Sequence, residues 1–241
     1  MLTAVNVLIL SRKYAKIFPV EGEKMMEQRI CCIFGAGVYF GDETVPQHAF
    51  VIAADAGVKA CKKLGVTPDV IIGDFDSLGY ALQGENIITL PKIKDDTDTL
   101  AAVRYGLEKG FAKFLLFGCT GGRLSHTAAN VQTLTFIAKH GAIGFLADKE
   151  EVATATCKGM YFDSECQGFL SVFAAEGSVN LSESGLKYEI ARQTVTADFP
   201  IGVSNEFIGT DAHITVHSGT ALLIIQKQPD RTDWNRWFEE R

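Results

Sequence analysis

The chain has no run of lysine or arginine, and its 241 residues carry a formal net charge of −6. A nucleic-acid partner is therefore not expected, because phosphate backbones attract clustered cations. The longest apolar runs are far shorter than a membrane span, so no membrane association is expected either. Neither a G-x-x-x-x-G-K-[ST] phosphate loop nor a G-x-G-x-x-G motif is present. Any nucleotide must then be bound through metal ions and isolated basic residues.

Cysteine pairs with C-x-x-C spacing are also absent, and several of the six cysteines lie inside apolar runs. These are Cys31, Cys32, Cys61, Cys119, Cys157 and Cys166. We expect reduced, mostly buried thiols in a cytoplasmic protein, in preference to disulfides or a zinc site. His213 and His217 can share one face of a predicted strand, but without a third ligand they do not predict a metal site.

The N-terminal stretch MLTAVNVLIL lacks a charged leader before it and a small-residue cleavage site after it. It is therefore not expected to act as a signal peptide. A second possible start lies at Met25 or Met26. We expect residues 1–25 to form an extension outside the folded core.

The rest of the chain has two regions, which differ in their pattern of apolar and polar residues. Up to residue 148, short apolar runs alternate with segments of helical period, which is typical of a mostly parallel sheet covered by helices. The expected strands are 30–34, 50–54, 70–72, 86–90, 114–118 and 143–147, and the expected helices are 57–65, 98–110 and 126–141. Beyond this point polar and apolar residues alternate, which predicts antiparallel strands in a small sandwich or barrel, with a short terminal helix. We expect an α/β domain over 26–150 and an all-β sandwich domain over 151–241.

Ligands of open parallel sheets bind beyond the carboxyl ends of the strands. In GDFDS (73–77), Asp74 and Asp76 are two positions apart, so in an extended or lightly turned segment both carboxylates can point the same way. They suit Mg²⁺, which prefers carboxylate and phosphate oxygens. Asp and Ser also stabilise turns, and from this segment alone the two interpretations are about equal.

A second acidic cluster, KDDTD (94–98), precedes a predicted helix. Capping of that helix by Asp96 or Thr97, with acidic residues favoured by the helix dipole, explains one or two of its three carboxylates. It does not explain Lys94. A lysine beside Asp95 and Asp98 suits a site that holds phosphate and metal together.

The third element is GGRLSH (121–126). Its two glycines let the backbone approach a ligand closely, and the planar fork of Arg123 suits phosphate oxygens. His126 is a candidate ligand or base, although a single histidine near a helix start is more often structural. Asn130 lies one helical turn further on and faces the same way.

Taken in order, the motifs resemble those of bacterial thiamine pyrophosphokinases over roughly residues 30 to 227. They are DAG, PDVIIGDFDS, KDDTD, GCTGGRLSH, GLKYEI, GVSNEF and GTALLII. The resemblance implies an α/β domain followed by a β-sandwich, and a homodimer with its active site near the subunit interface. It also implies Mg²⁺-dependent transfer of pyrophosphate from ATP to the hydroxyl of thiamine, giving thiamine diphosphate and AMP.

The same resemblance implies roles for individual residues. The expected metal ligands are Asp74, Asp76 and Asp98, and these three with Arg123 form the expected catalytic group. The expected nucleotide contacts are Asp55, Lys94, Asp95, Thr97, Arg123, Ser125, His126 and Asn130. Ser204 and Asn205 are expected to bind thiamine through its pyrimidine. One departure stands out, because the family usually reads G-G-R-x-D-H and this chain has Ser125 at the aspartate position.

Two rival functions remain open on the sequence. One is a pyrophosphokinase for another alcohol, which GLKYEI and GVSNEF disfavour because they match the thiamine side of the family. The other is a non-catalytic protein that binds thiamine or a nucleotide, which Ser125 favours and the other carboxylates disfavour.

Overall fold

The computed structural model describes residues 29–75, 84, 86–91, 96–228 and 233–238. The predicted extension 1–25 lies outside these residues, as do Asp76, Lys94 and Asp95. Within the described part, no helix is long and apolar enough to cross a membrane.

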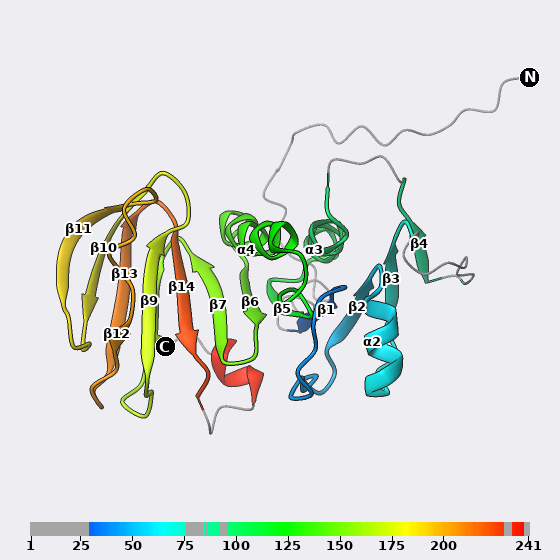
Figure 1. Cartoon of the computed structure of the whole chain (residues 1–241), viewed down its shortest axis with the longest axis horizontal. Helices are drawn as coiled ribbons and strands as arrows, with labels where there is room; N and C mark the ends of the chain where they lie inside the picture. The colour runs from blue at the N-terminus through cyan, green and yellow to red at the C-terminus, as the bar shows by residue number, and fades with distance from the viewer. Residues whose placement is uncertain (1–28, 76–83, 85, 92–95, 229–232, 239–241) are drawn as a thin grey trace, which may run out of the picture.

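Among the described residues, six strands form the parallel part of the structure (Figure 1). They are β1 (Ile30–Phe34), β2 (Phe50–Ala54), β3 (Val70–Gly73), β4 (Ile87–Thr89), β5 (Lys113–Phe117) and β6 (Ile143–Ala147). Their spatial order is β6-β5-β1-β2-β3-β4, with every neighbouring pair parallel. Strands β1, β2 and β6 have the predicted bounds, because continuous apolar runs mark strands that are buried on both faces.

Helices cover both faces of this parallel part. They are α2 (Gly57–Leu64), α3 (Asp98–Glu108) and α4 (Leu124–Lys139), with a terminal 3₁₀ helix η2 (Trp234–Phe238). Cys31 and Ile33 of β1 belong to the core under α3 and α4. Cys32 and Phe34 belong to the core that holds α2 and the tryptophans of η2. The alternation of side chains along one strand thus supplies two hydrophobic layers.

The helix ends follow their sequence signals. Gly65, the predicted stop of α2, has a φ of 69° and its N–H bonds to helix carbonyls. Thr97 caps α3 by accepting a hydrogen bond from the Leu100 N–H at 3.1 Å. Helix α4 begins at Leu124, two residues before the predicted start, since its N-cap is Arg123.

The second half of the chain is built from antiparallel strands. They are β7 (Glu151–Thr156), β8 (Gly159–Phe162), β9 (Phe169–Ala174), β10 (Ser178–Ser184), β11 (Ile190–Thr196), β12 (Asn205–Glu206), β13 (Ala212–Ser218) and β14 (Ala221–Gln226). Strands β11, β10, β13 and β8 form a four-stranded sheet. Its side chains share a core with those of β9 and β14, which makes the predicted sandwich.

The large sheet continues from one half of the chain into the other. In the described part of the chain its ten strands follow the order β12-β9-β14-β7-β6-β5-β1-β2-β3-β4. The join is antiparallel, with Phe145, Leu146 and Ala147 of β6 opposite Thr154, Ala153 and Val152 of β7. The two halves therefore share one sheet, and the division into domains at residues 150 and 151 stays a prediction.

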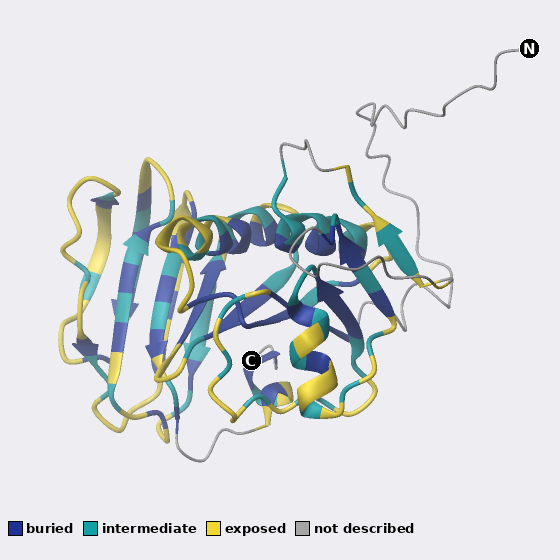
Figure 2. Cartoon of the chain, turned by 45° about the vertical axis from the view of Figure 1, so that its right-hand side comes forward, coloured by how far each residue is buried: buried dark blue, intermediate teal, exposed yellow. Residues whose placement is uncertain are grey.

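Burial differs between the two halves (Figure 2). Strands β1, β2, β5 and β6 are buried along almost their whole length. Strands β9, β10, β13 and β14 alternate buried residues with more exposed ones. Polar groups in the parallel half are consequently gathered at the strand ends.

Candidate functional site

The loops after β2 and β3 lie against each other at the carboxyl edge of the sheet. The N–H of Asp55 donates to the carbonyl of Ile72 at 2.8 Å. A Cβ atom added to Gly73 would lie 3.0 Å from the Cα of Asp55. Asp55 and the Gly73–Asp74 segment are thus brought together from two strands, and a side chain at Gly73 would crowd the backbone of Asp55. Asp55 itself has a φ of 48°, a left-handed conformation that is uncommon outside glycine.

The chain turns directly after Asp74. Phe75 is buried and has a φ of 58°, so the segment is not extended at this residue. The alignment of the carboxylates of Asp74 and Asp76 stays a prediction. Its ring lies near Gly73, where an added Cβ would come within 3.2 Å of it. Asp76 lies outside the described residues, so its predicted metal role is not tested.

The second acidic cluster starts helix α3. Asp96 forms an ion pair with Arg104 at 2.6 Å, and Thr97 is the N-cap, so both have structural roles. Asp98 is the first residue of the helix. In the next position, Thr99 hydrogen-bonds the buried thiol of Cys119, whose pKa burial raises to about 12. The start of α3 therefore touches the loop that follows β5.

The loops after β1 and β5 are joined by their backbones. The N–H groups of Gly35, Gly37 and Val38 donate to the carbonyls of Phe117, Gly118 and Thr120 at 2.8, 2.6 and 2.9 Å. A Cβ on Gly37 would lie 2.4 Å from the Thr120 oxygen, which is too close for any side chain. The GAG and GCTGG segments are thus two loops that pack closely against each other through their backbones.

Helix α4 carries the predicted phosphate-side residues on its first turns. Arg123, Ser125 and His126 are exposed. The guanidinium Nη2 of Arg123 contacts Nε2 of His126 in a short hydrogen bond. Asn130 differs from them, because it is buried and its amide donates to the Cys119 carbonyl at 2.8 Å. Asn130 therefore fixes the β5 loop.

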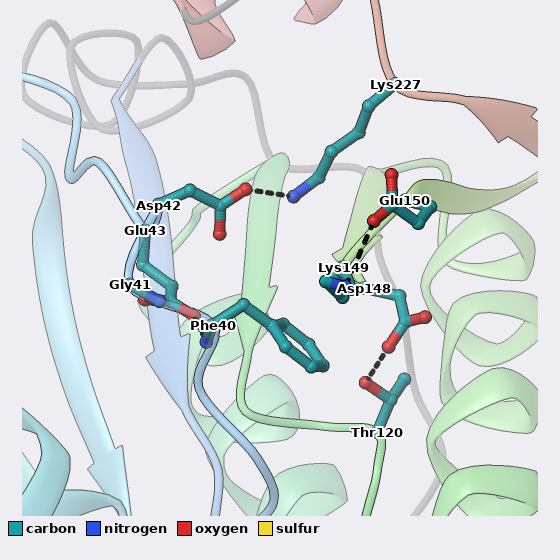
Figure 3. A network of polar contacts seen from close by, with 9 residues as sticks. All are labelled: Phe40, Gly41, Asp42, Glu43, Thr120, Asp148, Lys149, Glu150 and Lys227. Carbon is teal, nitrogen blue, oxygen red and sulfur yellow. Dashed lines mark hydrogen bonds and ion pairs between the residues drawn. The ribbon is translucent and has the colours of Figure 1, made fainter.

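A network of polar contacts joins this edge to the second half of the chain (Figure 3). Lys227, just after β14, pairs with Asp42 at 2.6 Å. The Thr120 hydroxyl donates to Asp148, which follows β6, in a short hydrogen bond. The Glu43 carboxylate accepts hydrogen bonds from the N–H groups of Phe40 at 2.6 Å and of Gly41 at 3.0 Å.

None of these contacts was predicted from the sequence. Lys227 and Asp42 are 185 residues apart, so no local pattern connects them.

The thiamine-side residues lie at the far edge of the large sheet. Ser204 is exposed, has a φ of 59°, and its N–H donates to the Ser171 hydroxyl at 3.0 Å. Asn205 begins the edge strand β12 and is buried. The carboxyl edge of the parallel strands and this edge strand are the two regions that the predicted site residues occupy.

A cluster of three or more His, Cys, Asp or Glu side chains placed to hold a metal is not found among the described residues. Asp76 belongs to the predicted group of metal-binding carboxylates, and Asp95 lies three residues before Asp98. Neither Asp76 nor Asp95 is among the described residues. Asp74 and Asp98 are described and lie at the carboxyl edge, so the oxygen donors that Mg²⁺ prefers are present there.

Comparison with known families matches both halves of the chain. The family described as "Thiamin pyrophosphokinase, catalytic domain" matches residues 42–144. The family described as "Thiamin pyrophosphokinase, vitamin B1 binding domain" matches residues 160–222. Both are domains of the same kind of enzyme, and they occur here in sequence on one chain.

Comparison with individual proteins also finds thiamine pyrophosphokinases. A thiamine pyrophosphokinase of Bacillus subtilis is 26% identical over 187 residues, which cover 74% of this chain and 87% of the relative. The crystal structure of a thiamine pyrophosphokinase from Bacillus subtilis has a TM-score of 0.72 at 24% identity, over 83% of this chain and 100% of that chain. The Candida albicans enzyme has a TM-score of 0.67 at 14% identity, over 85% and 92% of the two chains. The fold is thus shared even where few residues are, and the chain belongs to the thiamine pyrophosphokinase family.

Proposed function

We infer that this protein transfers a pyrophosphoryl group from ATP to the hydroxyl of thiamine, giving thiamine diphosphate and AMP. The observation that carries this inference is the match of a catalytic and a vitamin B1 binding domain to consecutive parts of the chain. In the reaction the thiamine oxygen forms a bond to the β-phosphorus of ATP. The bond between that phosphorus and the α,β-bridging oxygen breaks, AMP leaves with the electron pair, and the hydroxyl proton is released.

We propose that Asp74, Asp76 and Asp98 hold Mg²⁺ with the phosphates of ATP. The donor set fits, because Asp74 and Asp98 both lie at the carboxyl edge and carboxylate oxygens are the usual protein ligands of this ion. When bound, Mg²⁺ neutralises phosphate charge that would otherwise repel these aspartates. Asp55, whose backbone abuts Gly73, adds a further carboxylate beside Asp74.

The basic residues complete the phosphate side of this proposal. Arg123 is exposed at the start of α4, where helix N–H groups and a guanidinium favour anions. His126 contacts that guanidinium, which places it to orient Arg123. Lys94, Asp95, Thr97, Ser125 and Asn130 stay predictions as nucleotide contacts. Of these, Thr97 caps helix α3 and Asn130 holds the loop after β5, each through its own hydrogen bond.

We propose that the protein is a homodimer with the thiamine end of the site near the subunit interface. Large apolar side chains are exposed around the edge strand β12, which belongs to the sandwich half. They are Phe169, Tyr188, Phe199, Ile201, Val203 and Ile208. Exposed apolar residues gathered at one edge are typical of a subunit contact. Sedimentation equilibrium should give twice the chain mass for the wild type and one chain mass for Val203→Glu; a monomeric wild type would contradict the proposal.

A cytoplasmic location is also proposed. All six cysteines are free and five of them are buried, as expected where thiols stay reduced. Fractionation of cells that express the chain, followed by immunoblotting, tests this location.

One assay separates the proposed function from its rivals. AMP should appear from ATP only when thiamine and Mg²⁺ are both added. AMP formed without thiamine but with another alcohol would indicate a different pyrophosphokinase. Heat of thiamine binding in a calorimeter, with no AMP formed, would indicate the non-catalytic protein.

A further inference from the structure

The four-stranded sheet of the sandwich has an outer face that is made of polar side chains. Along β10 and β13, buried residues alternate with more exposed ones, and the more exposed positions carry hydroxyl, amide and imidazole groups. They include Asn180, Ser182, His213, Thr215 and His217. Figure 1 shows this sheet at the end of the molecule opposite β3 and β4, so the outer face is separate from the loop that carries Asp74.

The outer face carries no carboxylate from its own strands. All residues of β8, β10, β11 and β13 are described, and Glu183 is the one acidic residue among them. Its side chain is buried on the core side of β10, where it accepts a hydrogen bond from the Asn205 amide at 2.8 Å. In a chain with a formal net charge of −6, this face therefore repels an anion less than an average part of the surface does.

The pairing of β10 is irregular on both sides of Ser182. Against β11, Ser182 lies opposite two residues, Ala191 and Arg192, where one is expected. Against β13, the pairing skips His217, which lies between the partners of two consecutive residues of β10. These are two β-bulges, and bulges redirect side chains and are frequent beside active sites.

The extra residues of the two bulges meet at the Ser182 hydroxyl. The N–H of Arg192 donates to Oγ at 2.9 Å, and Nε2 of His217 lies 2.8 Å from the same oxygen. Nδ1 of His217 forms no hydrogen bond with any described residue. One hydroxyl, one imidazole and one arginine, from three different strands, are thus held together.

Arg192 has a fixed backbone and an unpaired charge. Its φ is 48°, and a left-handed residue other than glycine persists only where its surroundings hold it, often at functional sites. Here the carbonyl of Arg192 accepts a hydrogen bond from the Asn180 amide at 3.3 Å, opposite the bond from its N–H to Ser182. The exposed guanidinium forms no ion pair or hydrogen bond with any other described residue.

We propose that Arg192, His217 and Ser182 form a second binding site, for phosphate oxygens, on the outer face of the sandwich. The ligand is inorganic phosphate or the phosphate group of a small metabolite. A guanidinium offers two parallel N–H groups to phosphate oxygens. This site goes beyond the proposed transfer reaction and does not depend on it.

The His217–Ser182 pair supplies a further donor in either neutral tautomer. With the proton on Nδ1, the Ser182 hydroxyl donates to Nε2 and the Nδ1–H is left for a ligand. With the proton on Nε2, that N–H donates to Ser182 and the hydroxyl proton is left. Beside an unpaired guanidinium, a donor that is present in both cases favours an anion.

The test is a titration of the full-length protein with inorganic phosphate, followed by proton NMR of the five histidines at pH 7. Chloride keeps the ionic strength constant. We expect the Cε1 proton signal of His217, identified by its loss in His217→Gln, to move and to saturate. The signal of His126, identified in the same way, reports the proposed phosphate side separately. Movement at His126 without movement at His217 would overturn the proposal.

Arg192→Asn removes the guanidinium, and asparagine tolerates the left-handed conformation. We expect the Kd for phosphate, read from the His217 signal, to rise on the order of tenfold, as for loss of a hydrogen bond to a charged group. Lys63→Ala is the matched control, because it removes one exposed positive charge from α2 in the other half of the chain. Equal Kd values for the two variants would contradict the proposed site.

Titration with glycerol phosphate distinguishes the two sources of the ligand. Tighter binding of the ester than of inorganic phosphate indicates a metabolite, and the reverse indicates the free ion; no saturable movement with either refutes the site. Should Arg192→Asn be unfolded by circular dichroism, Arg192→Lys decides, because it keeps the charge and loses the planar fork. Weaker binding by Arg192→Lys supports the inference, and wild-type binding refutes it.

Discussion

The two ends of the proposed site are built from different kinds of contact. At the carboxyl edge of the parallel strands, backbone meets backbone across glycines, as where Gly37 bonds to Gly118 at 2.6 Å. At the edge strand β12, a buried side-chain amide and carboxylate join the segments. A glycine contact tolerates no added atom, whereas a side-chain contact can be altered in small steps. We therefore expect substitutions on the phosphate side to cause large losses of stability or turnover. On the thiamine side we expect substitutions to cause smaller, graded losses.

The largest effect is expected at the carboxylates. Asp74→Asn should lower kcat on the order of 10²–10³-fold, because loss of one electrostatic contact to developing charge has such consequences. Its circular dichroism should be unchanged, since Asp74 lies at a strand end. Glu108→Gln, an exposed carboxylate at the other end of α3 from Asp98, is the control. Near-normal turnover of Asp74→Asn at saturating Mg²⁺ would refute the metal assignment.

The glycine contact is tested by stability. Gly37→Ala places a Cβ 2.4 Å from a backbone oxygen and should lower the free energy of unfolding by about 1–3 kcal/mol, a usual cost of overpacking. Gly122→Ala is the matched control in the facing loop, because the nearest atom to its Cβ is 3.9 Å away. Urea denaturation that gave equal losses for the two variants would contradict the packing argument.

The side-chain network should respond to pH. Burial raises the pKa of Glu183 from 4.5, so the native state binds this proton more tightly than the unfolded chain. The free energy of unfolding therefore falls as pH rises from 4.5 to the raised value. The variant Glu183→Gln keeps an oxygen that accepts a hydrogen bond from Asn205, but its side chain has no carboxyl group that titrates. Relative to wild type, its stability in urea should increase between pH 4 and pH 7, and a constant difference would contradict this.

The smallest effect is expected at Ser125. No acidic residue lies in the first turn of α4, and Ser125 is exposed there. Ser125→Asp should stabilise the protein by about 0.3–1 kcal/mol through the helix dipole. We expect kcat/KM for ATP to rise a few-fold, as a missing carboxylate would be restored beside Arg123. An unchanged or lower kcat/KM would show that this chain does not need the family's aspartate.

Local signals were sufficient for much of the fold. Strand 143–147 was predicted with its observed bounds because its apolar run is uninterrupted. The stop at Gly65 was predicted because glycine readily adopts the left-handed conformation. Helix α4 begins two residues before its predicted start at residue 126. The prediction followed the apolar periodicity, and Leu124, which is 83% exposed, is not part of that pattern.

Long-range contacts could not be predicted. The pairing of β6 with β7 joins the halves, but alternation in β7 indicates only that it is a strand. The hydrogen-bond partners of Asn205, Tyr188 and Glu183, are 17 and 22 residues away in sequence, so no local pattern indicates that this amide is buried and paired. The sequence motifs identified which segments matter, whereas burial and hydrogen bonds distinguish the residues that hold the site from those exposed to a ligand.

The continuous sheet has a mechanical consequence for turnover. Hydrogen bonds along β6 and β7, Lys227 against Asp42, and Trp234 against Phe117 all bind the second half of the chain to the first. A hinge between the halves would have to break the sheet itself. One subunit is therefore expected to move as a single rigid body. In the proposed homodimer, the rearrangements that bring ATP and thiamine together would then fall to the surface loops and to the relative placement of the two subunits.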